Sequence, residues 1–411
     1  MLVIGMNNKE QQIPAIRFKG FTDAWEQRKL GEVADYYDGT HQTPTYANHG
    51  VKFISVENIR NIHDSDKYIS KQDYEKQFKI KPQINDIFMT RITAGIIGDT
   101  ALLEQDTPLA YYVSLALIRS KFVNPLFLEK YIGSPFFKKE LHKRIIHTAF
   151  PKKINLGEIG ECGVIIPNSM TEQIKVGSLF KKLDDTIALH QHQLNKYNKL
   201  KKTLLQKMFP KSGAKSSEIR FDGFTEEWKQ CKLDQIVIER NQQVQESIDF
   251  PLMSFTAKDG VTPKSDRYNR EFLVKSDNKK YKKTELGDLI YSSNNLDVGS
   301  IGINKTGNAV ISSVYSIFYT RDGITPEFVD MLIQRKDFIN KMIQFRQGVV
   351  YGQWRIHESD FLKIETRIPS SKEQIKMGAL FKQIDNTIAF HQQKVNDYQK
   401  LKEAVLKKMF I

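Results

Sequence analysis

Two stretches of the chain, 176–208 and 377–409, carry apolar residues at alternating spacings of three and four. This spacing puts the apolar side chains on one face of a helix and is typical of a coiled-coil seam. At about 1.5 Å per residue, each predicted helix, taken over the 38 residues at 172–209 or 373–410, is roughly 57 Å long. The predicted pairing residues are Phe180, Leu183, Ile187, His190, Leu194 and Tyr197, and in the second helix Phe381, Ile384, Ile388, His391, Val395 and Tyr398; either Leu200 or Lys201, and either Leu401 or Lys402, continues the stripe.

Both helices have the same predicted start. Ser169 precedes Glu172 by three residues, and Ser370 precedes Glu373 by three. This spacing predicts a capping box, in which the serine oxygen accepts a free amide of the first turn and the glutamate reaches back to the cap. A helix with one apolar stripe must bury it, so we expect the two helices to pack against each other.

The sequence repeats itself, and the repeats include both helices. Residues 16–30 and 219–233 share 10 of 15 positions, beginning with Ile-Arg-Phe-x-Gly-Phe-Thr in both copies. Residues 172–209 and 373–410 share about 23 of 38 positions without a gap. Fixed-offset similarity of this kind indicates an internal duplication.

Between these repeated phrases the two halves share a pattern but little identity. Each half has a strand after an acidic turn, then a second apolar strand, then one helix that proline opens at its first position. The strands are expected at 86–89 and 113–118, and at 288–291 and 314–319; the helices begin at Pro125 and Pro326. The interiors of both halves are therefore predicted to be mixed α/β.

We predict an α+β protein in which two mixed α/β domains are separated by two long antiparallel helices, with pseudo-twofold symmetry. Antiparallel packing is favoured because a short linker and a domain can start the second helix where the first one ends. The expected boundaries are an N-terminal tail at 1–15, a first domain at 16–166, a central helix at 167–210, a linker at 211–218, a second domain at 219–368 and a C-terminal helix at 369–411.

Charge indicates the kind of partner. The 411 residues include 62 Lys and Arg against 48 Asp and Glu, which gives a formal net charge of +14 and a pI of about 9.4. Such a balance suits a polyanionic partner. Two cysteines cannot build a disulfide framework or a four-thiolate zinc site. No signal peptide and no membrane-spanning run is readable, so we expect a cytoplasmic protein.

The sequence contains no readable catalytic motif. It has no phosphate-binding Gly-x-x-x-x-Gly-Lys-Ser/Thr loop, no Asn-Pro-Pro-Tyr/Phe tetrapeptide, no dinucleotide fingerprint and no zinc-type Cys/His spacing. We therefore predict no catalytic and no metal residues, although acidic side chains of a nuclease site could still meet in space. His190 and His391 share one seam position; a metal or switch role is open, but a buried residue that fixes the register is the favoured interpretation.

The duplicated arrangement resembles the DNA-specificity subunit of type I restriction–modification enzymes. The motifs that carry the resemblance are the Ile-Arg-Phe-x-Gly-Phe-Thr-x-x-Trp phrase at 16–25, its second copy from residue 219, and the helix starts at 167–174 and 369–375. The resemblance implies that each domain recognises one half of a split double-stranded DNA site, and that the helices space the domains and bind two methyltransferase subunits. It also implies that restriction subunits join the complex, and that S-adenosylmethionine, ATP and Mg²⁺ bind to partner chains rather than to this one.

Polar side chains on loops are the groups that read base edges. In the first domain the DNA-binding candidates are Thr40, His41, Gln42, Thr43, Thr45, Tyr46, Arg91, Thr93, Lys152, Lys153 and Asn155. In the second domain they are Thr256, Lys258, Ser292, Ser293, Asn294, Asn295, Gln347, Tyr351, Gln353, Trp354 and Arg355. Arg91 suits guanine, and Gln42 or Asn155 suits adenine. Trp25 and Trp228 lie in the repeated phrase, where a structural role is expected.

Two other functions remain open at this point. One is an enzyme that combines recognition with methylation or cleavage in a single chain. The other is a coiled-coil scaffold that never touches nucleic acid. The lysines of the two helices fit either a solvated outer face or contacts with a DNA backbone.

Overall fold

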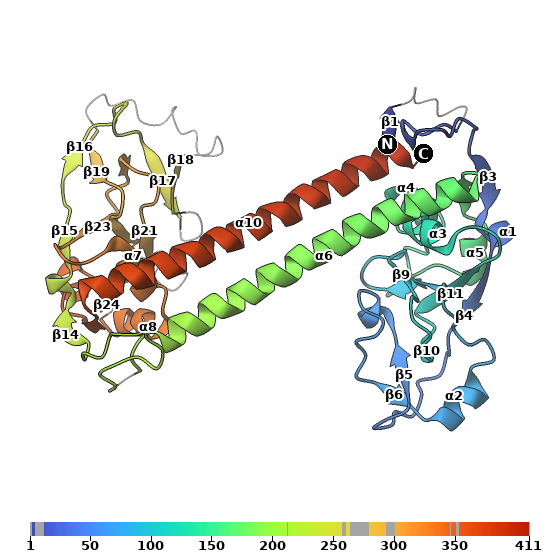
Figure 1. Cartoon of the computed structure of the whole chain (residues 1–411), viewed down its shortest axis with the longest axis horizontal. Helices are drawn as coiled ribbons and strands as arrows, with labels where there is room; N and C mark the ends of the chain where they lie inside the picture. Colours follow the sequence, from blue (N-terminus) through green and yellow to red (C-terminus); the bar gives the residue numbers. More distant parts are fainter. Residues whose placement is uncertain are drawn as a thin grey trace. The chain divides into compact units, whose positions relative to one another are not determined.

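A computed structural model describes residues 2–4, 12–211, 213–256, 260–263, 279–292, 301–345, 347–350 and 353–410. The chain divides into two compact units, one of residues 1–191 with 393–411 and the other of residues 192–392. The long helices α6 (Met170–Lys207) and α10 (Ser371–Met409) each contribute one end to each unit. Each unit therefore consists of a mixed α/β head and two helix ends (Figure 1).

The head of the first unit is built on an antiparallel sheet. Its strand order is β4 (Ala34–Asp38), β11 (Leu115–Ser120), β7 (Ile87–Thr90) and β9 (Thr100–Leu102). A second sheet has the order β10 (Leu109–Tyr111), β5 (Val51–Ile54) and β6 (Tyr68–Ile69), and β10 and β5 run parallel. Strands β3 (Glu26–Lys29) and β13 (Gly163–Ile166) form a separate antiparallel pair.

The helix expected after Pro125 is two helices. The first is α3 (Pro125–Ile132), whose start is capped by Asn124: its Oδ1 accepts from the amide of Phe127 at 3.0 Å. The chain then turns, and Ser134 caps α4 (Pro135–His142). The single-helix prediction is wrong because Gly133 and Ser134 favour an end and a new cap rather than a helix interior. Short helices α1 (Leu30–Val33), α2 (Lys71–Gln77) and α5 (Leu156–Gly160) complete this head.

The head of the second unit repeats this plan. Its main sheet has the order β15 (Val237–Glu239), β23 (Tyr315–Thr320), β20 (Leu289–Ser292) and β21 (Ile301–Ile303). Further strands are β14 (Lys229–Lys232) paired with β26 (Glu365–Ile368), and β16 (Gln243–Val244), β19 (Tyr281–Thr284) and β22 (Ala309–Ile311) in one sheet. Helices α7 (Pro326–Ile333), α8 (Lys336–Gln344) and α9 (Glu358–Phe361) occupy the chain positions of α3, α4 and α5.

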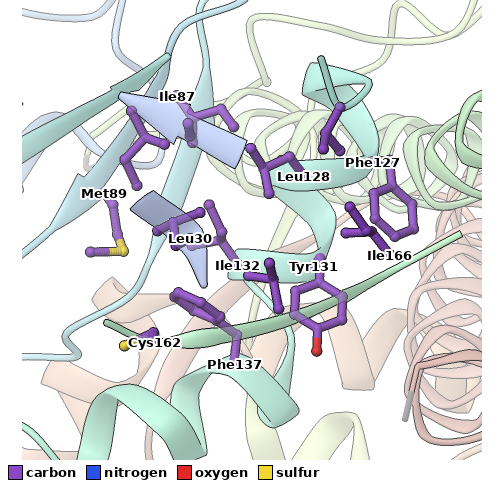
Figure 2. Close-up of a cluster of buried hydrophobic side chains, with 14 of the residues drawn as sticks. Leu30, Ile87, Met89, Phe127, Leu128, Tyr131, Ile132, Phe137, Cys162 and Ile166 are labelled. Atoms are coloured by element: carbon purple, nitrogen blue, oxygen red, sulfur yellow. The ribbon is translucent and has the colours of Figure 1, made fainter. Parts of the chain in front are cut away.

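The core of each head is closed by the ends of the long helices. In the first unit, side chains of the main sheet, α3 and α4 pack together, among them Ile87, Phe127 and Phe137 (Figure 2). Phe410, next to the end of α10, joins this core, with its ring 5.2 Å from that of Phe180 and 6.3 Å from that of Trp25. The equivalent Phe209 packs 5.5 Å from Trp228 in the second unit. The structural role expected for both tryptophans is confirmed.

A buried ion pair joins the two repeated phrases in each unit. In the first unit, Arg17 Nε and Nη2 donate to the two carboxylate oxygens of Glu172 at 2.6 and 2.9 Å. Arg220 and Glu373 make the same bidentate pair at 2.9 and 2.6 Å in the second. The capping-box prediction is therefore half right. Ser169 accepts from the amide of Glu172 at 3.4 Å, but the carboxylate of Glu172 binds Arg17 instead of reaching back to the cap.

The helices pack antiparallel within each unit, as predicted. In the first unit the ring of His190 stacks on that of Tyr398 at 5.8 Å, and in the second the ring of Tyr197 stacks on that of His391 at 5.9 Å. Lys402 pairs with Asp184, and Lys201 with Asp385 at 2.7 Å. All the predicted pairing residues are buried or half-buried. The stripe continues through Lys201 and Lys402, because Leu200 and Leu401 are exposed.

Part of the predicted N-terminal tail belongs to the first unit. Residues Leu2–Ile4 form β1, which pairs antiparallel with β2 (Ile16–Phe18). Arg17, the partner of Glu172, lies in β2. Strand β1 therefore adds main-chain pairing to the segment that carries the buried arginine.

Candidate nucleic-acid interface

Two of the predicted DNA-binding segments of the first unit lie side by side. Strand β8 (Ile92–Thr93) pairs antiparallel with β12 (Lys152–Lys153), so that Lys152 is opposite Thr93. The amide of Ile154 donates to the carbonyl of Arg91 at 3.0 Å. Residues some 60 positions apart in the sequence thus form one two-stranded ribbon at the end of β7, whose last residue is Thr90.

Asp38 connects the third segment to this ribbon. Its Oδ1 accepts from Arg91 Nη1 at 3.2 Å, and its Oδ2 lies 2.8 Å from His41 Nε2. The backbone of Thr40 bonds to Tyr111 and Val113, so the loop at 39–46 is fixed at its start. Gly39 permits this approach, because a Cβ there would lie 2.5 Å from the carbonyl oxygen of Tyr111. One carboxylate therefore orients side chains from two of the segments.

The predicted residues of the first unit differ in exposure. His41, Gln42, Thr43, Thr45, Tyr46, Lys152, Lys153 and Asn155 are exposed, and Thr40 and Thr93 are half-buried. Arg91 is only 7% exposed and is held by Asp38, so it is better placed to position the loops than to bind a guanine. Asn155 precedes α5, and within the described chain its side chain makes no capping hydrogen bond. Direct base contact by these residues stays a prediction.

The described ion pairs include cations of the segment before the ribbon but none of the ribbon's own lysines. Lys152 and Lys153 are adjacent and exposed, and neither forms an ion pair with a residue that the structure describes. By contrast, Lys138 pairs with Asp99 and Arg144 with Glu140 in the preceding segment. Unpaired ammonium groups on an exposed strand are well suited to phosphate contacts.

The structure describes six of the predicted residues of the second unit. Thr256 is exposed at the end of β17 (Met253–Thr256), and Ser292 is buried at the end of β20. Gln347 begins β24 (Gln347–Val350), and Gln353, Trp354 and Arg355 form β25, which pairs with it. The remaining candidates, Lys258, Ser293, Asn294, Asn295 and Tyr351, lie outside the described residues.

The hairpin of β24 and β25 stands where β12 stands in the first unit. The hairpin follows α8 and precedes the short helix α9, as β12 follows α4 and precedes the short helix α5. Ile356, just after β25, accepts a hydrogen bond at its carbonyl from Tyr291 of β20 at 3.4 Å. Ile154, just after β12, contacts Arg91 at the end of β7. The same position in the chain thus carries a single short strand in the first unit and a two-stranded hairpin in the second.

Sequence reasoning missed the groups that hold these segments in place. Asp38 was not a candidate, although an acidic residue just before a Gly-Thr-His loop is a signal for a local hydrogen-bond partner. Two exposed apolar side chains were also missed, Ile96 at 61% and Phe150 at 94% exposed. Both lie next to residues that were named, since Ile96 follows Thr93 and Phe150 precedes Lys152.

Comparison with known proteins identifies this scaffold. Residues 22–199 match the family described as the type I restriction modification DNA specificity domain. They include the loop at 39–46, the ribbon of β8 and β12 and most of α6. Over these residues the chain is similar to that family.

Two proteins similar to this chain illustrate the resemblance. The specificity subunit of type I restriction enzyme MjaVIII from Methanocaldococcus jannaschii is 24% identical over 190 residues; the match covers 44% of this chain and 44% of that subunit, less than half of its length. The S subunit of a type I restriction–modification system from M. genitalium has a TM-score of 0.63 at 13% identity, covering 94% of this chain and 96% of that one. The second similarity shows that the two chains share a fold.

Proposed function

We propose that this chain is a non-catalytic specificity subunit of a type I restriction–modification complex, in which each head recognises one half of a bipartite DNA site. One observation carries the proposal. The two units keep the same internal anchors, namely the buried Arg–Glu pair and the Phe–Trp contact, but carry different segments at the chain position of β12 and of β24–β25. Constant scaffolds with different surfaces suit two readers of different half-sites.

The proposed division of work within the first head follows from exposure. Exposed Gln42 and Asn155 carry amides that can bind adenine through two hydrogen bonds in the major groove. Exposed Lys152 and Lys153 bind the phosphate backbone and set the orientation of the head. Asp38 and Arg91 keep the loop and the ribbon in a fixed relation before DNA arrives. Preorganised groups lose less conformational entropy on binding than mobile groups do.

The helices are proposed to bind two identical methyltransferase subunits. Three exposed apolar positions occur in both copies: Ile174 and Ile375, Leu189 and Phe390, and Leu200 and Leu401. Leu189 and Leu200 are 11 residues apart, close to three helical turns, so they share one face of α6. Exposed apolar side chains on a shared face mark interaction surfaces. Equivalent surfaces in both units suit a partner that is present in two copies.

Chemistry is assigned to the partners in this proposal. Methyl transfer with S-adenosylmethionine, and ATP- and Mg²⁺-dependent restriction, belong to the methyltransferase and restriction subunits. Such a complex acts on DNA in the cytoplasm. Within the described part of the chain, none of the helices combines the length and hydropathy needed to cross a membrane.

A footprint of the assembled complex tests the proposal. The chain is copurified with a methyltransferase subunit and bound to a random-sequence DNA library, and the selected sites are sequenced and footprinted. We expect two specified blocks separated by a gap that tolerates any sequence. Exchanging the head at 219–368 for that of another specificity subunit should change one block only. One continuous block, or adenine methylation by this chain without a partner, would contradict the proposal.

A further inference from the structure

Phe150 is the most exposed aromatic side chain of the first unit among those the structure describes, at 94%. It lies at the tip of a loop whose base is fixed. The amide of Ile146 donates to the carbonyl of Lys153 at 2.8 Å, and Lys152 pairs with Thr93 across the ribbon. The ring is therefore presented on a short loop with an anchored base, and its position relative to the ribbon is set by main-chain hydrogen bonds.

A second apolar side chain lies at the same end of the ribbon. Ile96, 61% exposed, follows β8 by three residues, and Phe150 precedes β12 by two. Because Thr93 and Lys152 are opposite each other, both tips leave the ribbon at one end. Scattered exposed apolar residues are ordinary on protein surfaces. Here, however, Ile96 and Phe150 lie on two segments that leave the ribbon at the same end, and we call this pair of side chains the apolar point.

The polar and charged residues around this apolar point indicate that its partner is nucleic acid. Lys152 and Lys153 follow Phe150 after one intervening residue, Pro151, and form no ion pair within the described residues. His147 and Thr148, on the other side of the loop, are exposed and polar. An apolar side chain flanked by free cations matches the surface that unstacks bases, since the ring meets the base faces while the cations meet the phosphates.

We propose that Phe150 enters the base stack of the half-site that the first head reads, with Lys152 and Lys153 on the flanking phosphates. This inference rests on the proposed function. It adds to the DNA-binding candidates a residue that would act without a polar contact to a base. Insertion makes recognition depend on how easily one base step opens, and pyrimidine–purine steps open most easily. Phe150 would thereby contribute to sequence preference without reading a base edge.

The test uses the full chain assembled with its methyltransferase partner and the DNA site defined by footprinting. 2-Aminopurine, whose fluorescence rises when it is unstacked, is placed in turn at each position of both half-sites. We expect the fluorescence to rise at one base step of the half-site that the first head reads. In the other half-site we expect no rise that depends on Phe150. Phe150→Ala should abolish the rise and weaken binding roughly 10- to 100-fold. Phe150→Trp should retain both.

Phe122→Ala is the matched control. Phe122 is also an exposed phenylalanine of the first unit, at 52%. It lies just after the end of β11, whereas Arg91 and the ribbon contact Ser114, just before the start of that strand. Phe122 is therefore at the opposite end of β11 from the ribbon. We expect Phe122→Ala to leave both fluorescence and affinity unchanged. Because Phe150 is almost fully exposed, its substitution should not change the melting temperature.

Other outcomes overturn the inference in separable ways. If Phe150→Ala binds and unstacks DNA like the unmodified protein, Phe150 does not enter the stack, although the bipartite footprint still supports the proposed function. If Phe150→Ala instead loses the methyltransferase partner during copurification, the loop is a protein contact. If the unmodified complex gives no bipartite footprint, the proposed function itself fails.

Discussion

At the scale of single residues, the strongest constraint is the pair of Arg17 and Glu172. Both side chains are almost completely buried, and two charge-assisted hydrogen bonds join them. Removing one partner would leave the other charged and buried, which is far more costly than losing the attraction alone. The pair links strand β2 to the first turn of α6, and so links the head to its helix.

Substitution of this arginine should destabilise the first unit. We expect Arg17→Met to lower the free energy of unfolding by about 3–5 kcal/mol, because Glu172 keeps its burial and loses its partner. Urea denaturation measures the change. Lys29→Met is the control: Lys29 and its partner Glu161 are both exposed, so breaking this pair should change the stability far less. A similar effect of both variants would show that Arg17 does not anchor α6.

Salt dependence separates phosphate contacts from base contacts in the proposed interface. Lys152→Ala should reduce the slope of log affinity against log salt by about 0.9, because one phosphate contact is lost. Gln42→Ala should leave that slope unchanged and relax the preference for one base, at a cost of about 1–3 kcal/mol in discrimination. Binding measurements at several salt concentrations distinguish the two. An unchanged slope for Lys152→Ala would remove it from the phosphate contacts.

At the scale of elements, the charged groups beside the helix seam give the first unit a pH dependence. Burial alone would raise the pKa of Asp184, but the ammonium groups of Lys130 and Lys402 outweigh it and lower the pKa below its usual range. A carboxylate with a lowered pKa stabilises the folded state at neutral pH, and this stabilisation is lost as the pH falls through the lowered value.

Asp184→Asn should reveal this dependence. We expect the variant to melt at a lower temperature than the unmodified protein at pH 7, and the difference to shrink in strong acid, where Asp184 is protonated in both states. Melting curves from pH 7 down to pH 2 measure it. Asp185→Asn is a matched control, because Asp185 is exposed and the second helix has Asn386 at that position. A constant difference across the pH range would mean that the charge of Asp184 contributes nothing.

Elements were predictable where a local pattern decides them. The seam, the proline-opened helices and the strands after Asp86 and Asp288 follow from spacing and from caps that act within a few residues. The prediction failed where a distant group competes: Glu172 has the spacing of a capping box, but Arg17, 155 residues away in the sequence, binds its carboxylate. Arg91 was chosen as a base reader for the same reason, since its partner Asp38 lies on another strand.

At the scale of the whole molecule, the proposed function makes the helix pair a spacer. Inserting seven residues after Gln193 in α6 and seven after Lys394 in α10 preserves the phase of the seam and adds about 10.5 Å to each helix. We expect the selected DNA sites to keep both specified blocks and to move to longer gaps. Sequencing of sites selected from a library of gap lengths measures this.

The matched control is the same insertion in α6 alone, which should disrupt the antiparallel pairing and reduce binding to every gap length. Retention of the original gap by the double insertion would show that the helices do not set the separation of the half-sites.

The place of Phe410 in the core of the first head has a consequence for biosynthesis. This head is translated early, yet the rings of Trp25 and Phe127 gain their contact with Phe410 only after α10 has been made. At ordinary elongation rates, the nascent head would wait roughly ten seconds or more with this apolar surface uncovered on the ribosome. A truncated message that lacks the codon for Phe410 would therefore yield a first head with an incomplete core, which is expected to aggregate.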